Sequence, residues 1–151
     1  MKTRQLLPSF ICIVFAIAFT ACGTGKNQQR TPGNDVADMA ALQNKRWVLN
    51  RLPDTGFKAP ARDIYIQFGD NNTSISGFAG CNSYSGVFTA GAKTISFNNV
   101  ISTKMFCDNM PLENRMMRVL NETNAYIITG ETLQLLHDDK PLAWFSAVYL
   151  K

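Results

Sequence analysis

The chain has 151 residues, with 15 Lys and Arg against 11 Asp and Glu and a formal net charge of +4. This length suits one domain of ordinary size. Lys2 and Arg4 belong to an N-terminal leader, and without them the positive excess falls from +4 to +2. No cluster of Lys and Arg interleaved with aromatic residues occurs, so the sequence lacks the usual footprint of a nucleic-acid surface and no nucleic-acid partner is expected.

The N-terminus has the pattern of a bacterial secretory leader. It begins with positive charge, continues with an apolar run over 10–19, and reaches the small residue Ala21 just before Cys22. The apolar run is too short to span a membrane comfortably. The pattern therefore predicts a lipoprotein signal peptide over residues 1–21.

Cys22 is the predicted lipidation site, because the lipid is attached through a cysteine sulfur before the leader is cut. Each buried methylene contributes about 0.8 kcal/mol, so two or three acyl chains hold essentially permanently. Phe19 stands where Leu is commoner, so the match to a lipobox is imperfect. Two alternatives remain open: an ordinary signal peptide cut near Ala21, or an uncleaved anchor helix. Gly23 follows, without the acidic residue that favours inner-membrane retention in enterobacteria, so an outer-membrane location in the cell envelope is expected.

The cysteines divide by position. Cys12 leaves with the leader and Cys22 takes lipid, which leaves Cys81 and Cys107 in an exported domain. Oxidising conditions make a disulfide the default expectation, and closing that loop would contribute roughly 3–3.5 kcal/mol. Two buried free thiols are the alternative. Two cysteines with the single His137 cannot complete a zinc shell, so no metal site is expected.

Residues 22–40 are polar and include Gly25, Pro32 and Gly33. Such a segment cannot bury enough apolar surface to offset its ordering entropy, which predicts a flexible tether. The folded domain is expected over 41–151.

Within the domain the apolar residues recur mostly with a period of two, which predicts antiparallel strands. The last strand is apolar on both faces, so we expect it to be central or covered by a helix. The predicted strands lie at 47–49, 64–68, 73–77, 87–88, 94–97, 126–128, 133–136 and 142–150.

One segment has helical spacing, over residues 111–124. Pro111 suits the first helical position, and one face carries Leu112, Met116, Val119, Leu120 and Thr123. Glu113 falls outside this stripe, in the first turn, where it favours the helix dipole. Asp108 is expected to cap the helix. The predicted fold is mainly β (α+β): a compact antiparallel β domain with one α-helix.

No catalytic arrangement emerges from the sequence. His137 is the only histidine, and it lies in a predicted turn beside Asp138 and Asp139, a natural place for solvated polar residues. No enzymatic activity is expected.

Glycines Gly77, Gly80 and Gly86 surround Cys81 and Asn82. The segment continues into a strand, so it cannot form the helix N-terminus that a phosphate cradle requires. Glycines in a strand pattern mark bulges or close backbone approach. Asn82 is expected to support a turn through its side chain.

Residues 76–88, Ser-Gly-Phe-Ala-Gly-Cys-Asn-Ser-Tyr-Ser-Gly-Val-Phe, resemble the signature of the META domain, the HslJ-like heat-shock-associated family. The resemblance covers about residues 41–150 and includes Trp47-Val48-Leu49 and Thr103-Lys104-Met105-Phe106-Cys107. Phe106 departs from the pattern, where a small residue is commoner, and predicts local repacking. The motif positions, which we expect to be structural, are Gly77, Gly80, Cys81, Asn82, Gly86, Thr103, Met105, Cys107 and Glu113.

The resemblance implies a small, mostly antiparallel β domain with one helix, secreted or attached to the envelope. It carries over no catalytic residues and no cofactor. Cys81 and Cys107 match the two cysteine positions of the family, which strengthens the disulfide hypothesis. Members of the family are linked loosely to envelope stress, heat shock or virulence.

Three classes of function compete. The first is a non-enzymatic, lipid-anchored envelope protein, monomeric by default, that binds or stabilises another envelope component in a stress response. The second is a module that holds a lipid or other apolar molecule between sheet and helix, with adaptable methionines at Met105, Met110, Met116 and Met117. The third is an enzyme. An internal apolar cavity would favour the second class, and an exposed apolar patch the first.

Overall fold

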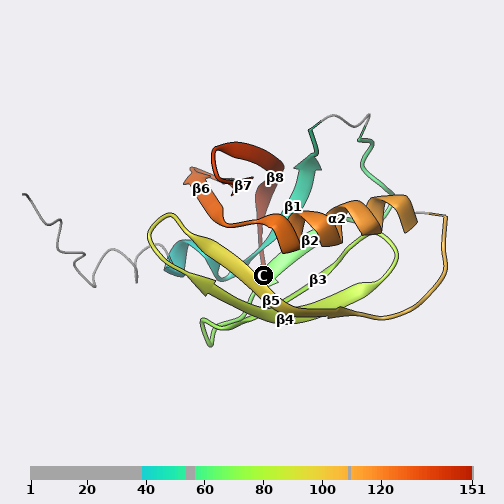
Figure 1. Cartoon of the computed structure of the whole chain (residues 1–151), viewed down its shortest axis with the longest axis horizontal. Coiled ribbons are helices and arrows are strands. Elements are labelled where there is room, and N and C mark those ends of the chain that lie inside the picture. Colours follow the sequence, from blue (N-terminus) through green and yellow to red (C-terminus); the bar gives the residue numbers. More distant parts are fainter. Residues whose placement is uncertain (1–38, 54–56, 109, 151) are drawn as a thin grey trace, which may run out of the picture.

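The computed structural model describes residues 39–53, 57–108 and 110–150. The predicted signal peptide, Cys22 and nearly all of the tether lie outside these ranges. In chain order the elements are β1 (Lys45–Arg51), β2 (Tyr65–Phe68), β3 (Ser74–Phe78), β4 (Ser83–Ala90), β5 (Ile95–Ser102), α2 (Met110–Glu122), β6 (Ala125–Thr129), β7 (Thr132–His137) and β8 (Lys140–Tyr149) (Figure 1). Residues 39–42 form a further helical turn. None of the helices in the described ranges combines the length and apolarity needed to cross a membrane.

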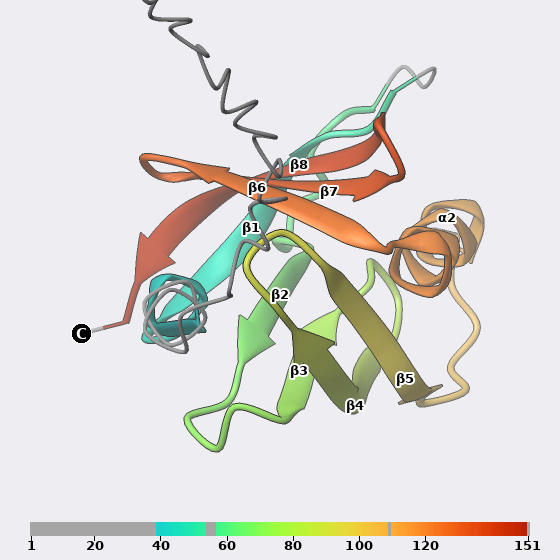
Figure 2. The same ribbon diagram turned by 60° about the vertical axis from the view of Figure 1, so that its left-hand side comes forward.

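The strands form one 8-stranded sheet in the order β5-β4-β3-β2-β1-β8-β7-β6, and every neighbouring pair is antiparallel. The sheet curls until its edge strands β5 and β6 approach each other (Figure 2). They meet at one end only, where the Tyr126 N–H donates to the Lys93 carbonyl at 3.0 Å and the Ile95 N–H donates to the Asn124 carbonyl at 3.2 Å. The helix α2 packs against β5 and covers the rest of the opening. The result is a half-barrel completed by a helix.

The core fills the inside of this curl. Trp47 of β1 is fully buried, and its indole N–H donates to the Leu42 carbonyl at 2.9 Å, which holds the turn at 39–42 across one end. The buried face of α2 covers the core at the opening between β5 and β6. The largest fully buried side chains are Trp47, Phe68, Phe145, Leu42, Ile64, Ile66, Ile95, Met116, Leu120, Leu133, Leu135 and Val119.

The strand predictions are confirmed in position, and the fold class is the predicted one. In β2, Ile66 and Phe68 are buried while Tyr65 and Gln67 are half-buried, as period-two alternation requires. The strand β8 lies between β1 and β7, so its apolar faces do belong to a central strand. Several strands are longer than predicted. Among them, β4 and β5 pair as far as Tyr84 with Ser102, although these ends lack apolar alternation.

Two motif glycines behave as the sequence predicted. A Cβ on Gly77 would lie 2.2 Å from the Tyr65 carbonyl oxygen, so no other residue fits where these strands pass. Gly86 lies where the pairing of β4 with β5 shifts register between Ser85 and Val87, which marks a bulge.

The outer face of the sheet brings together basic and aromatic residues that are scattered in the sequence. Each guanidinium lies over a ring, at 3.8 to 4.6 Å from the ring centroid. Such pairs cover aromatic surface that strands would otherwise expose. The pairs are Arg46 with Tyr65, Arg51 with Trp144 and Arg62 with Phe78.

Because of Tyr84, the stability of this sheet is expected to fall as the pH rises in the alkaline range. Its side chain is buried and its hydroxyl donates to the Tyr65 carbonyl at 3.1 Å. Burial, with a smaller contribution from Tyr65, raises the pKa of Tyr84 well above the ordinary 10.0. The contribution of neutral, buried Tyr84 to stability is fully present below the pKa that this tyrosine has in the unfolded state. It is lost as the pH rises toward the higher pKa of the folded state.

We predict that Tyr84→Phe, which has no group to ionise, loses less stability above pH 10.0 than the wild type, as measured by urea unfolding. Parallel losses in the two proteins would contradict this.

Candidate functional site

Several of the motif residues converge on a polar cluster at one end of the half-barrel, with Asn82 and Glu113 as its buried centre. We call Asn82, Thr103, Met105 and Glu113 the Asn82 cluster; they come from the β3–β4 turn, the loop after β5 and the first turn of α2. The turn forms because the Ala79 N–H donates to the Asn82 carbonyl at 2.9 Å.

Gly80 sits inside this turn with φ of +114°, a conformation that glycine adopts without steric cost. A Cβ there would also lie 3.2 Å from the Ile64 side chain. The glycine therefore sets the path of the turn that presents Asn82.

Glu113 is the charged member of the Asn82 cluster, and only 4% of its surface is exposed. Its Oε2 accepts the Asn82 N–H at 2.8 Å, and both carboxylate oxygens lie within 3.1 Å of Asn82 Nδ2. The expectation that Glu113 lies outside the buried face of the helix is wrong. It is buried because a turn far away in the sequence supplies hydrogen-bond donors, which offset the cost of desolvating a carboxylate.

The Asn82 side chain links the carboxylate to the loop after β5. Its Oδ1 accepts hydrogen bonds from the Thr103 hydroxyl at 2.7 Å and the Met105 N–H at 2.8 Å. Its Nδ2 also donates to the Met105 carbonyl at 3.0 Å. The amide therefore uses both its donor and its acceptor capacity, as a buried side chain of this type should. The amide of Asn82 thus bonds both backbone polar groups of one residue, Met105.

A disulfide between Cys81 and Cys107 lies beside the Asn82 cluster, with the two Cα atoms 6.0 Å apart. The structure thus pairs the cysteines as expected and does not show two free thiols. The bridge holds the far end of the loop that Asn82 grips at Met105.

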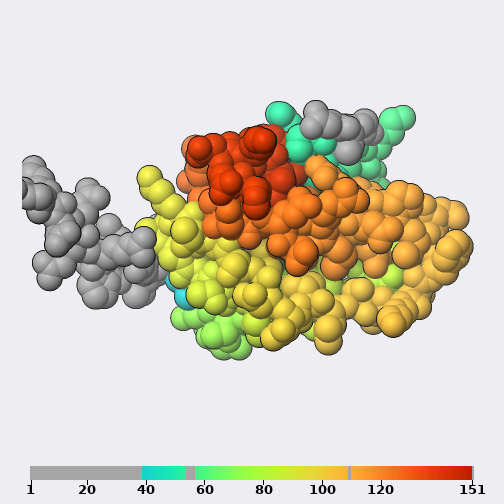
Figure 3. Space-filling view, in the orientation of Figure 1, coloured from blue at the N-terminus to red at the C-terminus, as the bar shows by residue number. Residues whose placement is uncertain are grey.

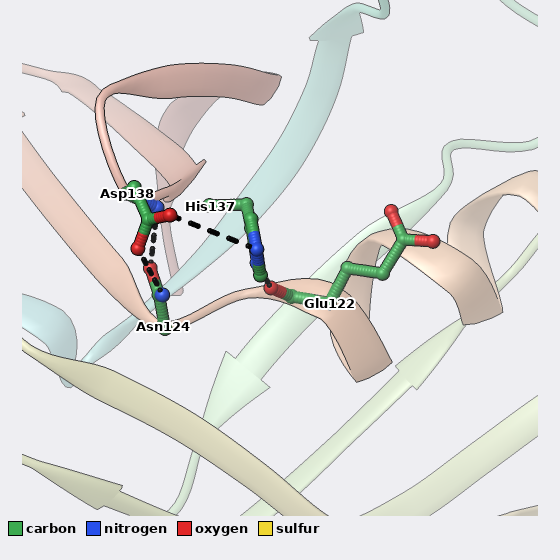
Figure 4. A network of polar contacts seen from close by, with 4 residues as sticks. All are labelled: Glu122, Asn124, His137 and Asp138. Carbon is green, nitrogen blue, oxygen red and sulfur yellow. Dashed lines mark hydrogen bonds and ion pairs between the residues drawn. The ribbon is translucent and has the colours of Figure 1, made fainter.

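His137 takes part in a second polar network at the other end of α2 (Figure 4). Its Nδ1 lies 2.6 Å from the Glu122 carbonyl, so this nitrogen carries the proton and donates to the end of the helix. Its Nε2 lies 3.9 Å from the Asp138 carboxylate, and Asp138 is paired with Asn124 through two hydrogen bonds of 2.7 and 2.8 Å.

His137 is the last residue of β7 and pairs with Lys140, so it flanks the predicted turn, of which Asp138 and Asp139 form the centre. Its side chain is 53% exposed. The last turn of α2 has no basic residue, so His137 supplies a donor for the carbonyls that every helix leaves unpaired there. No sequence pattern predicts this contact, because the partners come from separate elements.

Other candidates contribute less. Asp108 is exposed and makes no hydrogen bond to a described residue of α2, so the cap expected there is not seen. The residues described include no group of His, Cys, Asp and Glu that could hold a metal ion.

The end of β5 and the loop after it, which the Asn82 cluster holds, carry three exposed apolar residues that we call the apolar tip: Ile101, Met105 and Phe106. Their exposed fractions are 69%, 67% and 91%. The expectation that Phe106 requires local repacking is wrong, because its ring projects into solvent and displaces nothing. Sequence reasoning missed the tip because periodicity cannot distinguish an exposed aromatic loop residue from a buried one.

A groove of about 740 Å³ opens where the two sheet edges meet. It lies away from the Asn82 cluster, and its walls are mostly apolar. It is lined by Ala41, Ala92, Lys93, Thr94, Ala125, Tyr126, Ile127, Ile128, Leu136, Asp138 and Asp139.

The chain belongs to the META domain family, whose model matches residues 40–149. This match covers the whole half-barrel, the Asn82 cluster and the disulfide. No curated protein matches the chain.

Solved structures support the same fold. A protein from Burkholderia xenovorans, solved by NMR, is 23% identical over 74% of this chain and 87% of its own, with a TM-score of 0.59. A second NMR structure, whose source is not named, is 24% identical over 72% of this chain and 93% of its own, with a TM-score of 0.58. At these identities the likeness extends to the fold alone.

The Asn82 cluster predicts a specific stability effect. We expect Glu113→Ala to lower the free energy of unfolding by about 3 kcal/mol, because it leaves the buried Asn82 N–H and amide donors without an acceptor. Glu113→Gln keeps one carbonyl oxygen and should lose less. Glu122→Ala, exposed at the other end of α2, is the control and should change stability by less than about 0.5 kcal/mol. Urea unfolding measures all three, and equal losses at positions 113 and 122 would refute the role of the cluster.

Proposed function

We propose that this protein is a non-enzymatic, lipid-anchored protein of the bacterial envelope, whose META domain binds or stabilises another envelope component in a stress response. The observation that carries the non-enzymatic part of this proposal is the state of the Asn82 cluster. Its carboxylate and amide are buried and engaged with each other and with the backbone. The buried carboxylate and amide are thus used to hold a loop.

Two features support the envelope location. The leader ends at Cys22, and the Cys81–Cys107 disulfide is typical of proteins that fold in oxidising compartments. A tether of this length has a root-mean-square reach on the order of 20–25 Å. A domain held in this way would search for partners close to its membrane.

A second candidate is the binding of a small apolar molecule, and the groove between the sheet edges favours it. The sequence hypothesis placed the ligand between sheet and helix, but Met116, Val119 and Leu120 fill that space with buried side chains. Native mass spectrometry of the purified protein tests this alternative. A bound molecule that Ile127→Asp removes would support it, and an unliganded mass alone would count against it.

The anchor has its own test. In cells fed labelled palmitate, we predict that the wild-type protein takes up label and fractionates with the outer membrane, whereas Cys22→Ser stays unlabelled and is released. Cys12→Ser is the matched control, because that cysteine leaves with the leader. Label retained in Cys22→Ser would refute lipidation at this residue.

The partner can be tested in the same cells. After chemical crosslinking, we predict that the tagged protein recovers at least one envelope component. The control carries the same leader and tether on an unrelated domain. Recovery of the same set by both proteins would remove the support for a binding role.

A further inference from the structure

The apolar tip combines a held backbone with side chains that are mostly exposed. Asn82 fixes the N–H and the carbonyl of Met105 at 2.8 and 3.0 Å, and the disulfide fixes Cys107 on the other side. Between them, the Phe106 side chain is 91% exposed. A large apolar side chain that is held firmly in water incurs a hydration cost that nothing else in the described structure offsets.

We propose that the apolar tip is a docking knob that inserts into an apolar pocket of a partner protein. This inference rests on the proposed binding function and assigns it a place on the domain. Aromatic residues on a fixed backbone make effective anchors, because little side-chain entropy is lost when they are buried.

The position of the tip argues against the anchoring membrane as its occupant. Residues 39–43 hydrogen-bond to the β2–β3 turn through Gln43, whereas the tip is held by Asn82 in the β3–β4 turn. These turns lie at opposite ends of β3, whose residues alone span about 17 Å. Figures 1 and 3 show the loop after β5 at the end of the domain away from residues 39–42. A chain that comes from an anchor and enters the domain at residue 39 therefore reaches it at the end opposite the tip.

The size of the tip argues against a second copy of this chain. Its exposed side chains offer roughly 400 Å² of surface, taking Phe as a guide to each. A stable protein interface needs about 800 Å² from each side. Two convex tips facing each other would bury little, so the partner must supply a concave pocket and much of the contact area.

The test uses the full-length protein in its own cells, with a photoreactive phenylalanine analogue at position 106. The same analogue at Thr89, an exposed position on β4, is the control. We expect a discrete protein adduct from position 106, identified by mass spectrometry, that is absent from position 89. Adducts with lipid, or with a second copy of this chain, would overturn the proposal.

The identified protein is then purified and its affinity for this chain is measured. We expect Phe106→Ser to weaken binding about thirtyfold, the loss typical of an aromatic hot spot. Val148→Ser, which changes an apolar residue 48% exposed on β8, is the matched control and should bind like the wild type. Both variants should unfold at the wild-type temperature, because the residues are exposed. Equal affinity of Phe106→Ser and wild type would overturn the proposal.

Further crosslinking positions distinguish a wrong docking site from a wrong binding function. The analogue is therefore also placed at Ile127, in the groove, and at Arg51, on the outer face of the sheet. Specific adducts from these positions but not from 106 would overturn the knob and leave the binding function intact. No specific adduct from any position would count against both.

Discussion

The amide of Asn82 is the interaction on which this end of the molecule depends. It connects the β3–β4 turn, the loop after β5 and the first turn of α2, which are far apart in the sequence. A buried amide and a buried carboxylate are costly to desolvate, so the arrangement is stable only when every donor and acceptor is paired. This all-or-none requirement explains why the glycines nearby are needed as well. They let the backbone reach the one geometry in which the pairing is complete.

The cluster also helps to explain how a sheet that does not close into a barrel can enclose a hydrophobic core. The curled strands leave an opening between β5 and β6 that backbone hydrogen bonds close at one end only. The helix covers the other part, and its two ends are held in different ways. At its start Glu113 bonds to Asn82, and near its end the Glu122 carbonyl accepts a hydrogen bond from His137. Polar contacts at the ends position the helix, and apolar side chains along its inner face seal the half-barrel.

The sequence predicted what depends on local pattern. Alternation located the strands, helical spacing located α2 to within two residues at its C-terminal end, and the glycines Gly77 and Gly86 were correctly read as sites of close approach and bulging. The sequence did not predict contacts between residues that are far apart along the chain. Glu113 is buried because of a turn 31 residues earlier, and His137 serves a helix 15 residues earlier. Phe106 was misjudged for the opposite reason: no neighbour packs on it, and a family pattern alone does not reveal an exposed residue.

The order of strands in the sheet has a consequence for how the protein is made. The strand β8 lies between β1 and β7, so the last strand described is also a central one, and it joins the first strand to the final hairpin. Until β8 emerges during synthesis, β1 and β7 each present an unpaired edge and the half-barrel cannot close. Long-range pairing of this kind makes folding slow and leaves a nascent chain open to aggregation. The same delay lengthens the time for which the nascent chain stays unfolded.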